Sequence, residues 1–129
     1  MYNSSIKKVM VFGVFDTLHY GHHYFLSEAR EHGDELIVTV AQDSSVKNLK
    51  SKTPSQALSE RIDAIKKTHK ANNVVPGDAV RGSWKVITTH EPTVIAIGHD
   101  QYALREVLEE YCAKLPFAVH FVTIDKLEI

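Results

Sequence analysis

The sequence has little of several features that mark specialised classes of protein. Cys112 is the only cysteine among 129 residues, so no disulfide can form within the chain. The formal net charge of −1 provides no overall basic field that would draw the protein to nucleic acid or acidic membranes. No apolar run approaches the roughly 20 residues of a membrane-spanning helix, and the start of the chain lacks a signal-peptide pattern. These absences predict a cytoplasmic protein with neither nucleic-acid nor membrane partners.

What the sequence does contain is an alternation of strand-like and helical segments within one domain, residues 1–129. Runs of apolar and β-branched residues predict five strands, and apolar residues at helical spacing predict four helices. The expected strands are 9–12, 35–41, 73–75, 93–97 and 118–123, and the expected helices are 22–32, 58–69, 83–90 and 102–115.

The strand at 35–41 is almost continuously apolar, which is typical of a parallel sheet covered by helices on both faces. Alternating strands and helices then predict an α/β, Rossmann-like, doubly wound, five-stranded parallel sheet. Ligands of such sheets bind outside the carboxyl ends of the strands. Polar segments follow three of the expected strands there: 13–22, 43–54 and 98–101.

The segment 13–22 carries the strongest functional pattern. It contains His19, Gly21 and His22 at the point where the first strand leads into the first helix. The N-terminus of a helix presents unpaired backbone N–H groups and attracts phosphates. Gly21 allows a close approach to the backbone, and the two histidines can add donors. A zinc site built from His19, His22 and His23 is the weaker alternative, and a mere helix-capping loop is another.

The pattern Gly13-x-Phe15-Asp16-x-x-His19-x-Gly21-His22 resembles the signature of the cytidylyltransferase-like (HxGH) nucleotidyltransferases. The resemblance implies that an acceptor phosphate attacks the α-phosphate of a nucleoside triphosphate, with Mg²⁺ as cofactor and pyrophosphate as leaving group. It implies catalytic roles for His19, His22 and Lys47. The nucleotide-binding residues implied are Gly13, Val14, Phe15, His19, Gly21, His22, Lys50 and Asp100, and no protein metal ligand is assigned.

Four further residues are open to two readings each. In the family, basic residues of the segment 43–54 hold phosphates, and Lys47 and Lys50 match best, although a solvated charged loop gives the same pattern. Arg61 is a candidate clamp for an acceptor phosphate or a solvent-facing helical arginine. Asp16 either acts on the acceptor and Mg²⁺ side or satisfies backbone N–H groups of its turn.

The segment Gly98-His99-Asp100-Gln101 resembles a Gly-Tyr-Asp-Gln segment of archaeal-type FAD synthetases, which transfer AMP to FMN. That resemblance gives Asp100 a place in the nucleotide pocket, whereas the structural alternative is an aspartate that caps the following helix. Trp84 is expected to pack a helix on the sheet rather than to cover a base. Cys112 belongs to an apolar stripe of the last expected helix; the stripe comprises Leu104, Val107, Leu108, Tyr111, Cys112 and Leu115.

The sequence therefore favours an adenylyltransferase that makes FAD from ATP and FMN. A CTP-dependent enzyme acting on glycerol-3-phosphate is second, and a heptose-phosphate adenylyltransferase is third. The family's usual Ser/Thr-rich segment after the last strand is absent from the sequence, so a catalytically weak nucleotide-binding module is a further alternative. A receiver-type domain would need an aspartate after the third strand, and residues 74–77 offer none. A homodimer is compatible with all of these.

Overall fold

A computed structural model describes residues 6–44, 54–80 and 82–127 of the chain. Five strands form one parallel sheet in the order β3-β2-β1-β4-β5. The strands are β1 (Lys8–Gly13), β2 (Glu35–Val40), β3 (Asn73–Pro76), β4 (Val94–Gly98) and β5 (His120–Ile124). The helices are α1 (Tyr20–Arg30), α3 (Leu58–Lys66), α4 (Lys85–His90) and α5 (Tyr102–Cys112).

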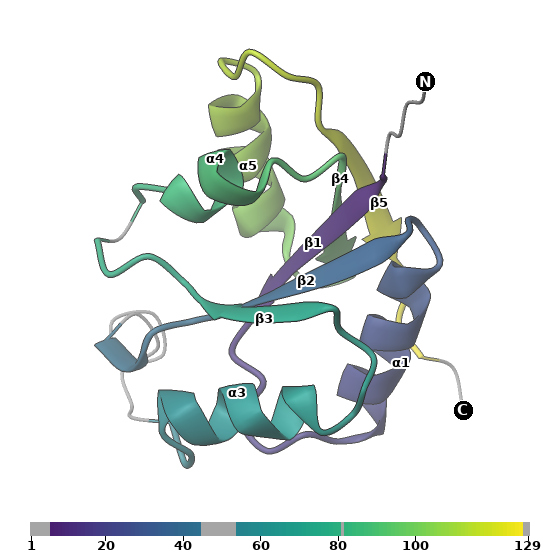
Figure 1. The fold of residues 1–129 in the computed structure, drawn as a ribbon, viewed down its shortest axis with the longest axis vertical. Helices are drawn as coiled ribbons and strands as arrows, with labels where there is room; N and C mark the ends of the chain where they lie inside the picture. The colour runs from purple at the N-terminus through teal and green to yellow at the C-terminus, as the bar shows by residue number, and fades with distance from the viewer. Residues whose placement is uncertain (1–5, 45–53, 81, 128–129) are drawn as a thin grey trace.

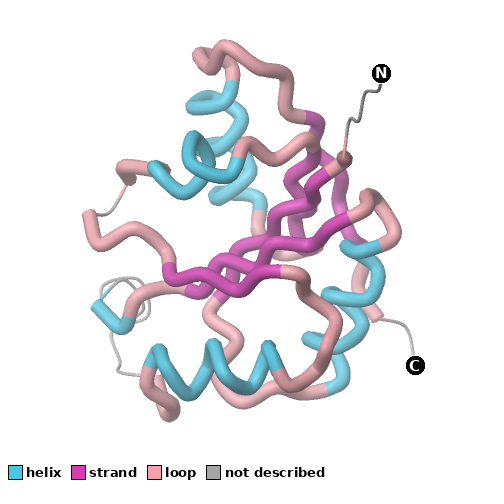
Figure 2. Tube along the Cα trace, in the orientation of Figure 1, coloured by secondary structure: helices cyan, strands magenta, loops and turns pink. Residues whose placement is uncertain are grey.

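Helices cover both faces of the sheet, as Figures 1 and 2 show. Successive side chains of a strand point to opposite faces, so β1 contributes to two cores. Val9 and Val11 pack with α1 and α3, whereas Met10 and Phe12 pack with α4 and α5. The predicted doubly wound parallel fold is confirmed, because the chain alternates between strand and helix and reverses direction across the sheet at β1.

The ends of the elements differ from the sequence expectations by a few residues. Helix α1 begins at Tyr20 rather than at residue 22, because the ring of His19 caps it. Helix α5 ends at Cys112, before the expected residue 115. The expectation that Val107 is buried is wrong, since 49% of it is exposed. Val107 lies about 100° around the helix from Leu108, at the margin of the stripe that faces the sheet.

The two halves of the sheet separate where β1 meets β4. Strand β1 is paired with β2 along its whole length, from Lys8 to Gly13. Its register with β4 covers only Val9↔Val94 and Met10↔Ile95. The register stops three residues before the carboxyl end of each strand, at the β1/β4 junction, which is the place where open α/β sheets bind ligands in a crevice.

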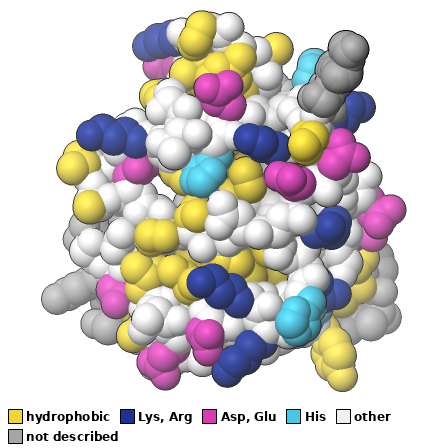
Figure 3. Space-filling view, in the orientation of Figure 1, with side chains coloured by type: hydrophobic (Ala, Val, Ile, Leu, Met, Phe, Trp, Pro, Cys, Tyr) yellow, Lys and Arg dark blue, Asp and Glu magenta, His cyan; other side chains and the backbone are white. Residues whose placement is uncertain are grey.

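The surface carries both signs of charge. Figure 3 shows basic and acidic side chains interspersed over the visible face, without a field of one sign. Among the described helices, none combines the length and the apolar character that crossing a membrane requires.

Candidate functional site

His19 and His22 meet at the amino end of α1. The Nδ1 atom of His19 accepts a hydrogen bond from the backbone N–H of Gly21, with N···N 3.1 Å. The Nδ1 atom of His22 accepts one from the backbone N–H of His19, with N···N 3.2 Å. The two rings stack with 3.9 Å between their centroids and 24° between their planes. The capping reading and the functional reading of these histidines are thus compatible.

These hydrogen bonds select the tautomer of the histidines. A neutral imidazole carries its proton on one nitrogen and accepts on the other. Because Nδ1 accepts in both rings, Nε2 carries the proton and is the donor. The arrangement presents imidazole donors at the amino end of a helix, where the helix dipole favours negative charge.

The absence of a side chain at Gly21 leaves room for the ring of His19. A Cβ atom at residue 21 would lie 2.9 Å from Cε1 and 3.1 Å from Nδ1 of His19. Phe15 supports the second ring, since its centroid lies 5.6 Å from that of His22. Phe15 is itself only 3% exposed and belongs to the core. Its side chain thus supports the ring of His22 from the core, and only the backbone of Phe15 would be available to contact a nucleotide.

Arg61 does not face solvent, so the alternative of a solvent-facing helical arginine is wrong. Its side chain is fully buried. Its guanidinium donates to the carbonyl oxygens of Val14 (2.8 Å), Ala41 (2.9 Å) and Gln56 (3.1 Å). It also forms an ion pair with Asp43. With its donors directed at these four groups and no exposed surface, Arg61 is not placed to clamp an acceptor phosphate. Burial of its helix face against the loops after β1 and β2 is the reason.

Asp16 binds backbone N–H groups of a distant segment. One carboxylate oxygen accepts from the N–H of Ser55 at 2.8 Å, and the other accepts from that of Gln56 at 2.9 Å. These two hydrogen bonds hold the pKa of Asp16 below its usual value; desolvation opposes them, and the nearby charge of Arg61 adds a smaller lowering effect. The side chain of Asp16 thus fixes loops, and neither oxygen is directed at an acceptor site by these contacts.

The segment after β4 lies beside the crevice. Gln101 precedes α5 and bridges β1 and β4 beyond their paired residues: its Oε1 accepts from the N–H of Gly98 at 2.8 Å, and its Nε2 donates to the carbonyl oxygen of Phe12 at 3.0 Å. Asp100 is exposed, and its Oδ1 lies 3.6 Å from the point that a Cβ atom at residue 98 would occupy if Gly98 carried a side chain. The N-cap of α5 is Gln101, and no side chain caps that helix end. The alternative of Asp100 as a capping residue is therefore wrong.

Gln101 and Gln56 have contacts in the structure that no pattern in the sequence predicts. Gln101 lies within the segment quoted for the FAD synthetase resemblance, which is the pattern that could have drawn attention to it. No pattern distinguishes Gln56 in the sequence, although its Oε1 accepts from the N–H of Thr17 at 2.9 Å. Lys47 and Lys50 lie outside the described residues.

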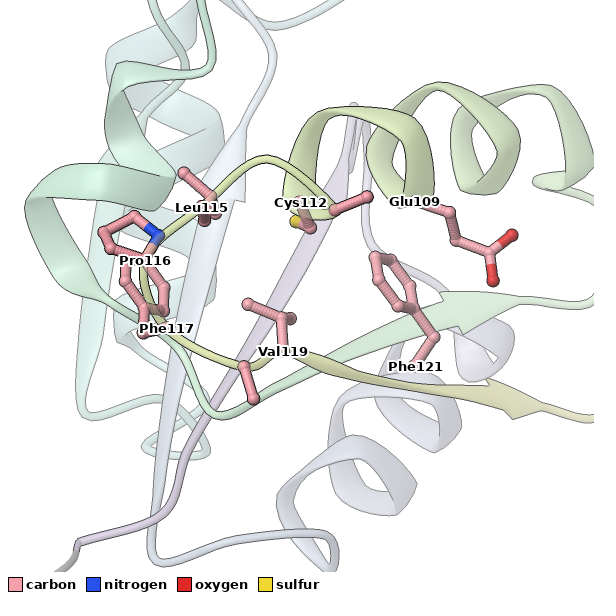
Figure 4. A pocket seen from close by; sticks show the side chains of 9 residues that line it. Glu109, Cys112, Leu115, Pro116, Phe117, Val119 and Phe121 are labelled. Atoms are coloured by element: carbon pink, nitrogen blue, oxygen red, sulfur yellow. The ribbon is translucent and has the colours of Figure 1, made fainter.

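Other candidates pack in the core or lie at the surface. Trp84 packs edge-on against Phe12, at 5.7 Å between ring centroids, which confirms its packing role. Cys112 borders a hollow between α5 and β5, beside Leu115, Val119 and Phe121 (Figure 4). It is 8% exposed and burial raises the pKa of its thiol, as expected of a packing cysteine. Within the part of the chain that the structure describes, no three His, Cys, Asp or Glu side chains gather as metal ligands.

Comparisons with known proteins agree with this geometry. The model of the family described as cytidylyltransferase-like matches residues 10–127. Two similar curated proteins are named FAD synthase. The one from Pyrococcus abyssi is 37% identical over 120 residues, 93% of this chain and 81% of its own. The one from Methanosarcina mazei is 36% identical over 124 residues, 94% of this chain and 80% of its own.

Solved structures of other proteins share the fold of this chain. A lipopolysaccharide core biosynthesis protein from Thermoplasma volcanium superposes with a TM-score of 0.88 and 32% identity, over 96% of this chain and 100% of that one. Pantoate-β-alanine ligase from Francisella tularensis, with 12% identity and a TM-score of 0.69 over 96% of this chain and 60% of that one, shares the fold alone. The chain belongs to the cytidylyltransferase-like family of nucleotidyltransferases.

Proposed function

We propose that this protein is an FAD synthase, which transfers AMP from ATP to FMN and releases pyrophosphate. The observation that carries the proposal is the paired Nε2 donors of His19 and His22 beside the β1/β4 crevice. The choice of acceptor is supported by the FAD synthases that match more than nine tenths of the chain.

The reaction requires the protein mainly to position the two substrates and to stabilise the negative charge that develops. A phosphate oxygen of FMN forms a bond to the α-phosphorus of ATP, and the bond from that phosphorus to the bridging oxygen of pyrophosphate breaks. The attacking oxygen is already ionised, so no general base is needed. Donors held at the helix end stabilise the negative charge that builds on the α-phosphate and the leaving group. His19 and His22 are the donors that we assign to this role.

A divalent cation is part of the proposal, with Mg²⁺ as the ion. Mg²⁺ in such sites is typically held by substrate phosphates and one or two carboxylates. The described residues fit that mode, because Asp100 is exposed beside the crevice whereas both oxygens of Asp16 already accept backbone hydrogen bonds. When bound, the ion would neutralise charge on the triphosphate. Asp100 is proposed to lie on the nucleotide side of the site.

The test is product formation with matched substrates. The purified protein with Mg²⁺, ATP and FMN should yield FAD and pyrophosphate, and CTP with glycerol-3-phosphate should yield no CDP-glycerol. Removing the donor at residue 19 or 22 should lower kcat on the order of 10²-fold with folding intact, as is typical when one preorganised donor is lost. His32→Ala, an exposed histidine after α1, is the matched control and should leave kcat unchanged.

Two outcomes would contradict the proposal. Formation of CDP-glycerol without any FAD would show that the substrates are CTP and glycerol-3-phosphate. The assignment of the histidine site would remain. Turnover at the wild-type rate in both His19→Ala and His22→Ala would remove the histidines from the mechanism.

A further inference from the structure

The loop that leads from β1 to His19 contains two residues in an unfavourable backbone conformation. Phe15 has φ 54° and Thr17 has φ 61°. Both values lie in the left-handed region, which costs free energy for any residue with a Cβ atom and is rare for a β-branched residue such as threonine. Such a conformation persists only where surrounding contacts impose it.

The contacts that impose it come from one segment, 55–61. The N–H groups of Ser55 and Gln56 bind the carboxylate of Asp16, which lies between the two left-handed residues. The Oε1 atom of Gln56 accepts from the N–H of Thr17. From the first turns of α3, Arg61 donates to the carbonyl oxygen of Val14. Four hydrogen bonds therefore fix three of the four residues 14–17, namely Val14, Asp16 and Thr17, shortly before the His19 cap.

Arg61 also connects this segment to the end of β2. Its guanidinium binds the carbonyl oxygen of Ala41 and the carboxylate of Asp43. The guanidinium of Arg61 is fully buried, although Asp43 is about half exposed, and an unpaired donor of a buried guanidinium is costly. The segment 55–61 is thus anchored to the sheet and provides a rigid support for the loop.

We infer that the segment 55–61 is a latch that sets the position of His19 and His22 for phosphate transfer, with Gln56 as its main positioning residue. The inference rests on the proposed function for its link to catalysis. The side chain of Gln56 contacts the loop at the N–H of Thr17 and carries no charge, and the bond of its backbone N–H to Asp16 does not depend on the side chain. Its loss should release Thr17 from the left-handed region and let the His19 cap shift. A displacement of about 1 Å at a catalytic group can lower the rate on the order of 10²-fold.

The first test is the variant Gln56→Ala. We expect kcat for FAD formation to fall on the order of 10- to 100-fold, with KM for ATP changed by less than about threefold, because the latch orients donors without binding substrate. Asp63→Asn, on α3 just beyond the segment 55–61, is the matched control. It removes only the exposed ion pair with Lys67 and should leave kcat unchanged.

The second test is rescue by a residue that accepts the left-handed conformation. Asparagine adopts that conformation more readily than threonine does. If Gln56→Ala lowers kcat a hundredfold, adding Thr17→Asn to that variant should therefore raise kcat again by at least tenfold. A general loss of stability would not be repaired in this way, so the rescue separates positioning from folding.

A readout without turnover separates this inference from the proposed function. Imidazole ¹H–¹⁵N spectra of the ligand-free protein should show Nε2-protonated His19 and His22 with shifts displaced by ring stacking. Gln56→Ala should move both sets of signals toward those of exposed histidines, and the double variant should return them. Unchanged histidine signals together with kcat within twofold of wild type would overturn the latch. So would a loss of kcat that follows the unfolded fraction and that Thr17→Asn does not repair. If the wild-type protein forms no FAD, the proposed function fails, and the spectra still decide the latch.

Discussion

At the scale of single residues, the site depends on side chains that bind backbone groups. The rings of His19 and His22 each accept a backbone N–H, and both carboxylate oxygens of Asp16 do the same. Such bonds fix the orientation of a side chain more strictly than an exposed pair of side chains does, because the backbone partner has no rotamers. The charge of Asp16 is therefore a structural element of this site.

Asp16 should make stability depend on acidic pH. Its folded pKa is lowered, chiefly by the N–H groups of Ser55 and Gln56. The unfolded state therefore binds a proton first as the pH falls, so the contribution is fully present above the unfolded value of about 4 and is lost as the pH drops through the lower folded value. Thermal unfolding between pH 6 and pH 2.5 should show a smaller acid-induced drop in Tm for Asp16→Asn than for wild type. Parallel curves for the two proteins would contradict this assignment.

At the scale of elements, the β1/β4 junction is held by a side chain where a ladder of backbone hydrogen bonds would otherwise run. The two strands are paired at Val9↔Val94 and Met10↔Ile95, and Gln101 then bridges Phe12 and Gly98. One amide thus satisfies a donor and an acceptor at the open end of the crevice. The same amide fixes the start of α5 and the turn that carries Asp100.

Gln101→Met should test this bridge, since methionine has a similar length and no amide. The N–H of Gly98 and the carbonyl oxygen of Phe12 would both lose their partner, which should cost about 1–3 kcal/mol of unfolding free energy. Nucleotide binding should weaken because the turn of Asp100 loses its anchor. Urea unfolding and calorimetric titration with Mg·ATP measure the two effects. Glu106→Gln, an exposed change on α5, is the control, and equal stability of Gln101→Met and that control would refute the bridge.

At the scale of the whole molecule, one buried arginine connects loops from separate parts of the chain. Arg61 joins Val14 and Ala41, which follow neighbouring strands, to Gln56 before its own helix. A guanidinium presents five N–H donors in a rigid plane, whereas a lysine ammonium presents three at one point. No other side chain of the 20 types would serve all these partners at once.

Arg61→Lys should therefore destabilise the fold although it keeps the charge. Two or more of the carbonyl oxygens of Val14, Ala41 and Gln56 would lose their donor in a buried place, at a cost on the order of 2–4 kcal/mol. The midpoint of urea unfolding measures this cost. Lys67→Ala, in the exposed part of the same helix, should change stability by less than about 0.5 kcal/mol. A midpoint of Arg61→Lys equal to that of wild type would show that the network is not needed.

Much of the fold follows from local patterns in the sequence. Strand and helix order, the parallel sheet, the position of the histidine motif and the burial of Cys112 were all predictable, because each depends on the spacing of apolar residues or on neighbours within one turn. The contact between the Nδ1 atom of His19 and the N–H of Gly21 is of the same local kind.

The functions of Asp16, Gln56 and Arg61 were decided by the tertiary structure alone. Their partners lie far along the chain: 39 residues separate Thr17 from Gln56, 40 separate Asp16 from Gln56, and 47 separate Val14 from Arg61. In the sequence, Arg61 reads as one more charge on the polar side of a helix. In the structure Arg61 lies four residues before Ile65 on the face that α3 packs against the loops after β1 and β2, while Glu60 and Lys66 stay exposed, and burial makes each of its hydrogen bonds obligatory. The sequence by itself determined which groups form the histidine cap at the amino end of α1, because they are neighbours within one turn, and the packing of distant segments decided which groups hold the preceding loop in place.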